Sequence, residues 1–110
     1  MEAHDYPIAH FELMTKVAGF LKSKGVQLLE AEYSYKVFGL WSFTFQIKGQ
    51  NYRILRDGRD FVLTLATDIG GSAPFSNKWG ELVIVPIEGL REDVIQKEVE
   101  VLIEKAIGQA

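Results

Sequence analysis

Apolar residues recur at helical spacing near both ends of the chain. The first stripe starts after Asp5, a residue type that caps helix N-termini, and stops at "KSKG", where Gly25 can take the left-handed cap conformation. The second stripe runs from about Leu90 to Ile107. The spacing therefore predicts one amphipathic helix at each end, with these apolar positions facing the core: Ile8, Phe11, Met14, Val17, Ala18, Leu21, Val94, Ile95, Val99, Leu102, Ile103 and Ala106.

Between the two helical stretches the pattern changes to a period of two. Four segments alternate apolar and polar residues: "LLEAEYSYKV", "WSFTFQIK", "NYRILR" and "DFVLTLA". "ELVIVPI" predicts a possible fifth strand, with Pro86 favouring an edge or a strand end. We therefore expect a single α+β domain over residues 1–110. It would have an N-terminal helix, a four-stranded antiparallel meander with a possible fifth strand, and a C-terminal helix, with both helices on one sheet face.

Turn chemistry predicts the register of this meander. Two-residue turns at Asp57-Gly58 and Gly49-Gln50 and a three-residue turn at Phe38-Gly39-Leu40 keep large apolar residues together. They would pair Ile54 with Phe61, Phe45 with Ile54, and Tyr33 with Phe45. The expected core face contains Ala31, Tyr33, Phe45, Ile47, Tyr52, Ile54, Phe61 and Leu63. The expected solvated face contains Glu30, Glu32, Gln46, Lys48, Asn51, Arg53, Val62 and Thr64.

The first and third turns of an antiparallel meander lie at the same end of the sheet. That end would carry three apolar residues beside four charged ones: Phe38, Leu40, Trp41, Arg56, Asp57, Arg59 and Asp60. Tryptophan and arginine are enriched at the dominant contacts of protein interfaces, so this end is a candidate partner-binding surface. In the alternative, Phe38, Leu40 and Trp41 fold under a helix end and the charges only solubilise the turn.

Composition narrows the functional classes. The formal charge of −3 comes from interspersed acids and bases, which disfavours nucleic acid and anionic membranes as partners. The chain has no cysteine, so it has neither disulfides nor a thiol nucleophile, and a cytoplasmic location is expected. No apolar stretch approaches the length needed to span a bilayer.

No motif indicates catalysis. The two histidines, His4 and His10, do not share a helical face, so we expect no metal site. There is no "GxSxG" elbow, and "DIGGS" lacks the lysine of a phosphate loop. Glu30 and Glu32 share a strand face and could act as acid and base, but charge pairing with neighbouring cations is the favoured interpretation. We therefore expect no catalytic residue and no cofactor.

The segment "DIGGSAPFSNKWG", residues 68–80, is long for a connection in so small a domain. It could cover a small-molecule pocket lined by Tyr35, Phe75 and Trp79, as in a ligand-binding protein or a small enzyme. A third hypothesis is a homodimer that forms through the exposed sheet face or an edge strand.

Residues 37–66 carry a resemblance that bears on these alternatives. A strand ending in Phe38-Gly39, followed by "NYRILRDGRD" with Arg53, Arg56, Asp57 and Gly58, resembles small bacterial α+β proteins, including immunity proteins that neutralise polymorphic toxins. The resemblance implies a non-enzymatic protein that binds a cognate protein. Protein binding through the turn end is therefore the leading hypothesis.

Overall fold

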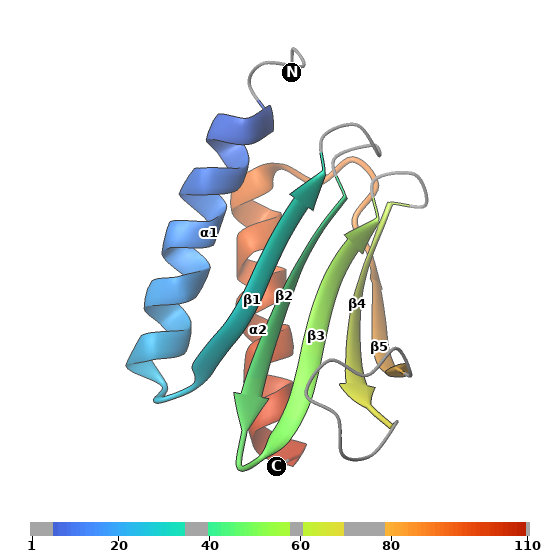
Figure 1. The fold of residues 1–110 in the computed structure, drawn as a ribbon. Coiled ribbons are helices and arrows are strands. Elements are labelled where there is room, and N and C mark those ends of the chain that lie inside the picture. The colour runs from blue at the N-terminus through green and yellow to red at the C-terminus, as the bar shows by residue number, and fades with distance from the viewer. Residues whose placement is uncertain (1–5, 35–39, 58–60, 70–78, 110) are drawn as a thin grey trace.

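The predicted order of helices and strands is confirmed, and the fifth strand belongs to the sheet. The computed structural model describes residues 6–34, 40–57, 61–69 and 79–109. Five antiparallel strands lie in the order β1-β2-β3-β4-β5, so β5 forms one edge (Figure 1). The elements are α1 (Tyr6–Ser23), β1 (Gln27–Ser34), β2 (Leu40–Ile47), β3 (Gln50–Asp57), β4 (Val62–Asp68), β5 (Trp79–Pro86) and α2 (Glu92–Gln109).

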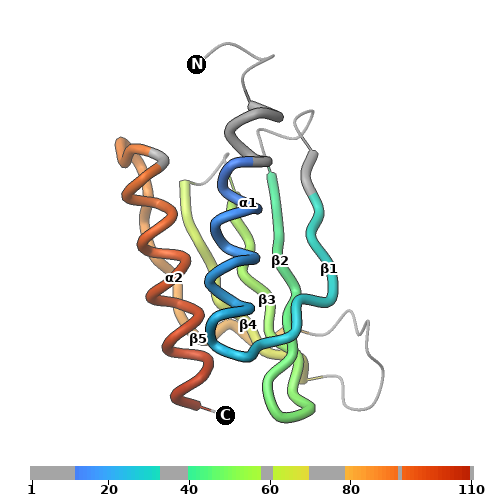
Figure 2. The backbone as a smooth tube through the Cα atoms, turned by 90° about the vertical axis from the view of Figure 1, so that its left-hand side faces the viewer, coloured from blue at the N-terminus to red at the C-terminus, as the bar shows by residue number. Residues whose placement is uncertain are grey.

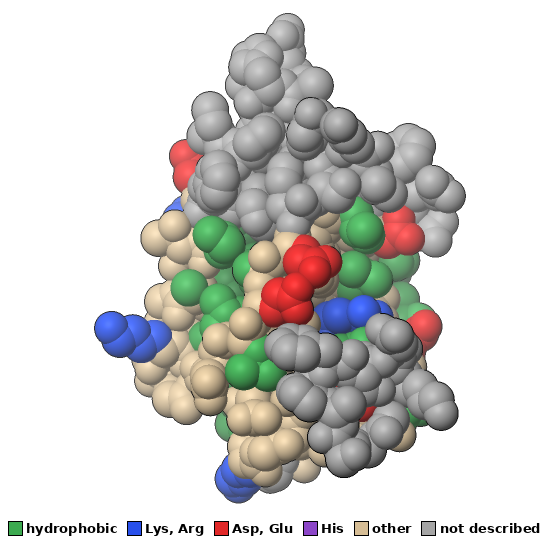
Figure 3. Space-filling view, in the orientation of Figure 1, with side chains coloured by type: hydrophobic (Ala, Val, Ile, Leu, Met, Phe, Trp, Pro, Cys, Tyr) green, Lys and Arg blue, Asp and Glu red, His purple; other side chains and the backbone are tan. Residues whose placement is uncertain are grey.

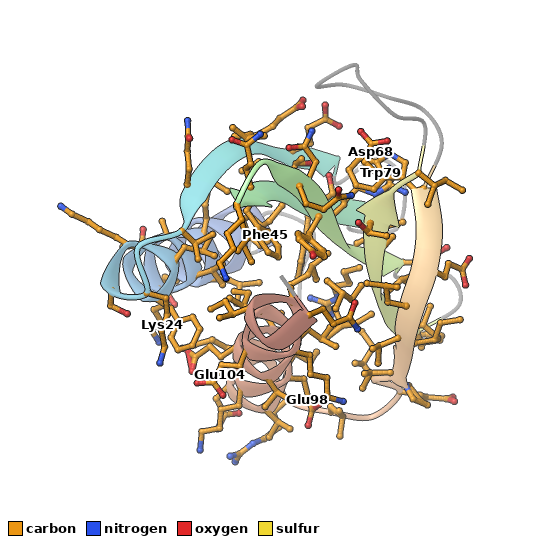
Figure 4. The ribbon with its side chains drawn as sticks, turned by 90° about the horizontal axis from the view of Figure 1, so that it is seen from below. Lys24, Phe45, Asp68, Trp79, Glu98 and Glu104 are labelled. Atoms are coloured by element: carbon orange, nitrogen blue, oxygen red, sulfur yellow. The ribbon has the colours of Figure 1, made fainter. Side chains whose placement is uncertain are left out.

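The two helices lie side by side on one face of the sheet, as expected. The tube view shows α1 and α2 in one layer and the strands in another (Figure 2). Seen from below, the sheet curves around the helices, and Phe45 points into the space between the layers (Figure 4). The core consists of the inward side chains of the sheet and the apolar stripes of the helices, among them Phe43, Ile54, Leu65, Val99 and Leu102, all fully buried.

Gly25 ends α1 in the way that the sequence predicts. Its φ of 71° is left-handed, a conformation that costs glycine little. The Val26 amide donates to the Leu21 carbonyl at 2.9 Å, and the Gly25 amide donates to the Lys22 carbonyl at 3.1 Å. These two bonds form a Schellman motif, which satisfies carbonyl groups that the helix end would leave unpaired.

The turn between β2 and β3 is one residue earlier than predicted. Lys48 and Gly49, with φ of 51° and 81°, both take left-handed conformations, as a type I′ turn requires. Phe45 therefore lies opposite Tyr52 rather than Ile54, and the two rings stack with centroids 5.9 Å apart. The predicted pairing was wrong by two residues, because the sequence "KGQN" accommodates the glycine at either central position of a two-residue turn.

The other two predicted registers were wrong by four residues. Tyr33 lies opposite Trp41 rather than Phe45, and Ile54 lies opposite Leu65 rather than Phe61. The cause is connection length, since β1 ends at Ser34 and β2 begins only at Leu40, while β3 ends at Asp57 and β4 begins at Val62. Even shifts keep each residue on its face of the sheet, so Ile54 still faces the helices.

Phe61 is the clearest exception to the predicted core. It precedes β4 rather than lying within it, its φ is 54°, and its side chain is 49% exposed. Its place in the core is taken by Leu65, which is fully buried. The longer connection thus converts an expected core phenylalanine into a surface residue.

Candidate functional site

The turn end of the sheet lies where β2 begins and β3 ends. Trp41 pairs directly with Arg56 across these strands, and Leu40 and Asp57 flank that pair. The side chains of Leu40, Arg56 and Asp57 are half-buried. Three other predicted members of this surface, Phe38, Arg59 and Asp60, lie outside the described residues.

Trp41 is at the turn end but its side chain points into the protein. It is only 2% exposed, and its ring packs on Phe43 with centroids 5.0 Å apart and the planes tilted by 52°. A side chain buried to this extent cannot contact a partner while the fold is intact. The accessible surface at the turn end is therefore formed without it.

Phe61 supplies an exposed aromatic group at the same end. Its backbone is fixed, because its carbonyl accepts a hydrogen bond of 2.8 Å from the Ile87 amide. The Leu90 amide in turn donates to the Ile87 carbonyl at 3.1 Å, and the Leu90 side chain is also exposed. We call the group Leu40, Arg56, Asp57, Phe61 and Leu90 the turn-end surface. No motif in the sequence marks Phe61 as exposed. The exposure of Phe61 follows from the length of the connection between β3 and β4, which the sequence does not reveal.

A second group of polar residues lies on the sheet face away from the helices. Glu30, Thr44 and Arg53 form one row across β1, β2 and β3, and Glu32 follows on the same face of β1. Figure 3 shows this face, with acidic side chains beside a basic one. Glu30 and Glu32 thus lie on the same sheet face as Arg53, as expected, with Arg53 in the row of Glu30.

Arg53 is held beneath an aromatic ring. Its guanidinium carbon lies 4.6 Å from the ring centroid of Trp79, a cation–π geometry. Partial burial lowers the pKa of Arg53, an effect that the negative charge of Glu32 opposes. Within the described part of the chain, the buried Nε of Arg53 has no hydrogen-bond partner. Trp79 therefore covers the Arg53 guanidinium without supplying a hydrogen-bond acceptor for its Nε.

Trp79 is the one predicted pocket residue that can be placed. It pairs with Asp68 at the start of β5, and Figure 4 shows both on the outer side of the sheet. Tyr35 and Phe75 lie outside the described residues. A hydrogen bond of 2.8 Å from Gln50 Nε2 to the Asp68 carbonyl and one of 2.7 Å to Thr67 Oγ1 tie this end of β4 to β3.

The Glu30–Glu32 pair provides a pH-dependent test of this face. A hydrogen bond to Glu32 and the negative charge of Glu32 both raise the pKa of Glu30. A raised carboxyl pKa means that the folded state holds the proton more tightly than the unfolded state. The free energy of unfolding is therefore highest at acidic pH, where Glu30 is protonated. It falls as the pH rises through the raised pKa, because the two carboxylates then repel each other. We expect Glu30→Gln to raise the Tm at pH 7, because it removes the repulsion.

Thermal melts at several pH values check this prediction. The gain from Glu30→Gln should shrink as the pH falls through the raised pKa of Glu30, because the Glu30 carboxyl becomes protonated in the parent protein. Glu88→Gln, at an exposed carboxyl outside the pair, serves as the control. An equal gain at all pH values, or the same gain in the control, would contradict the repulsion between Glu30 and Glu32.

Among the described residues, no group of three or more histidine, aspartate or glutamate side chains is arranged to hold a metal ion. Neither α1 nor α2, within the residues described, has the length and apolar character of a membrane-spanning helix.

Comparison with known proteins gives no match: no family model, curated protein or solved structure is significantly similar to this chain. The function of this protein is therefore inferred from the geometry of the turn-end surface and of the sheet.

Proposed function

We propose that this protein is a non-enzymatic binding module that recognises another protein through the turn-end surface. The observation that carries the proposal is the conformation of Phe61. A bulky residue at φ 54° stores strain of roughly 1–2 kcal/mol, and here the strained residue exposes half of an aromatic side chain. Strained residues of this kind cluster at binding and catalytic sites.

The neighbours of Phe61 support a protein as the ligand. Arg56 and Asp57 lie at the same end of the sheet as the exposed Phe61 and Leu90, and Asp57 pairs with Val62, the residue after Phe61. Charged residues around an exposed aromatic residue match the polar rim and aromatic anchor of protein interfaces. The resemblance to immunity proteins implies a cognate toxin domain as the partner class to test first. A cytoplasmic site of action is consistent with a chain that has no cysteine.

The substitution Phe61→Asn separates binding from stability. Asparagine tolerates the left-handed conformation better than phenylalanine, so the free energy of unfolding should stay within about 1 kcal/mol of the parent or rise. Loss of the aromatic anchor should weaken partner binding by at least about tenfold. The measurements are a urea unfolding curve, affinity capture with tagged protein, and titration of the captured partner.

Ile69→Asn is a matched control, because Ile69 is an exposed apolar residue at the opposite end of β4. A single stoichiometric partner that binds the parent and the control but not Phe61→Asn supports the proposal. Two results count against it: a Phe61→Asn variant that binds like the parent, or one that loses more than about 2 kcal/mol of stability. The second result would make Phe61 a structural residue.

A further inference from the structure

β5 forms one edge of the five-stranded sheet. Because β5 is the last strand in the sheet order, no described strand pairs with its other side. The strand is apolar, and Leu82 and Ile84 are 38% and 54% exposed. Natural edge strands of this kind tend to pair with another chain unless they are protected.

The hydrogen-bond pattern identifies which backbone groups of β5 point outward. The Ile87 amide donates to Phe61, so these two residues form a hydrogen-bonded pair. Hydrogen-bonded and non-hydrogen-bonded pairs alternate along an antiparallel ladder. The pairs Leu63–Val85 and Leu65–Val83 are therefore bonded to β4, whereas the N–H and C=O of Ile84 point away from β4.

Two features limit the length of edge that can accept another strand. The register shifts at Leu82, where β5 has an extra residue relative to β4. At the other end, Pro86 has no N–H to donate at the free edge. The accessible stretch runs from residue 82 to residue 86, and Ile84 is its midpoint.

We propose that a second copy of this chain pairs with this edge, β5 against β5 in antiparallel orientation, with the two-fold axis at Ile84. In this register each Ile84 exchanges two hydrogen bonds with the other Ile84. Leu82 lies opposite Pro86 of the second copy on the same face. The exposed apolar residues of the two β5 strands thus form one continuous patch. The two five-stranded sheets become a single sheet across the two-fold axis.

Charge favours self-pairing at β5 over the opposite edge. Glu81, the one charged residue of β5, would lie opposite Ile87 of the second copy, so like charges do not meet. In β1 the corresponding antiparallel pairing would set Glu30 and Glu32 against their counterparts, which is destabilising. Pairing over so short an edge places the contact at the small end of interface sizes, so the dimer should dissociate on dilution.

Cysteine cross-linking tests the register, since the natural chain has no cysteine. In the proposed dimer the two Ile84 Cα atoms lie about 5.5 Å apart, within the range of disulfides. The two Leu82 Cα atoms would be separated by more than about 13 Å. Mild oxidation should therefore cross-link Ile84→Cys at least about ten times faster than Leu82→Cys.

Sedimentation velocity over a roughly hundredfold concentration range tests the dimer itself. The parent and Val101→Lys, altered at an exposed site on α2, should dimerise, whereas Ile84→Lys should remain monomeric because two lysines would meet at the axis. An unchanged Tm verifies that each variant is folded. A parent that is monomeric throughout, equal cross-linking of both cysteine variants, or a dimer that survives Ile84→Lys would overturn the proposal. Phe61→Asn should still dimerise, so this result is independent of partner binding.

Discussion

Replacement of Trp41 by alanine is expected to lower the free energy of unfolding by about 3–5 kcal/mol. Trp41 is almost completely buried and packs on Phe43, so truncation leaves a large cavity in the core at the start of β2. Arg56→Ala, at the residue paired with Trp41, should cost less than about 1 kcal/mol, since Arg56 is only half-buried at the end of a strand. Urea unfolding of the two variants measures this difference.

The conservative variant Trp41→Phe makes the result specific. It restores most of the buried ring and should recover more than half of the stability lost in Trp41→Ala. If Trp41→Ala were as stable as the parent, the tryptophan would not be part of the core. Trp41 would then be a candidate contact residue at the turn end, as the sequence predicts. Partner capture by Trp41→Ala is informative only under conditions where that variant is folded.

The side-chain pattern was sufficient to predict which face of each central strand is buried. Phe45, Tyr52 and Ile54 all face the helices although none has its predicted partner. The reason is that the side chains of a strand alternate with a period of two, and all three registers are displaced by an even number of residues. The buried face of a strand can therefore be predicted correctly even where its pairing partners are predicted wrongly.

The connection lengths could not be predicted from local sequence. Gly49 and Gly58 each fit a tight turn in the sequence, yet β2 and β3 are joined by the two-residue turn Lys48-Gly49, whereas β3 ends at Asp57 and β4 begins only at Val62. The loop before β4 is longer because Leu63 and Leu65, rather than Phe61 and Leu63, fill the positions under the helices. That choice depends on packing against α2, which lies at the far end of the sequence.

The location of the turn-end surface could be predicted because it depends on topology and not on register. In any antiparallel meander the first and third connections lie at one end, so Leu40, Arg56 and Asp57 are brought together regardless of the pairing. The identity of its aromatic residue could not be predicted. Trp41 lies at the start of β2 and Phe61 immediately before β4, and the loop lengths decide which of the two points inward.

Replacing Leu102 by aspartate should remove most or all of the stability of the fold, a loss of more than about 4 kcal/mol. Leu102 is fully buried where α2 covers the sheet, alongside Val99, Ile103 and Ala106. Among the described core residues there is no cation with which a carboxylate at this position could pair. Domains of this size are stable by only about 5–15 kcal/mol, so the helical CD signal should be lost at a much lower temperature.

The neighbouring substitution Val101→Asp provides the matched control. Val101 is exposed on the opposite side of α2, and an aspartate there would lie four residues from both Lys97 and Lys105. Its Tm should stay close to that of the parent, because the free energy of unfolding should change by less than about 0.5 kcal/mol. Similar losses in both variants would mean that α2 does not present this face to the sheet. A stable Leu102→Asp would mean that the helix is not required to close the core.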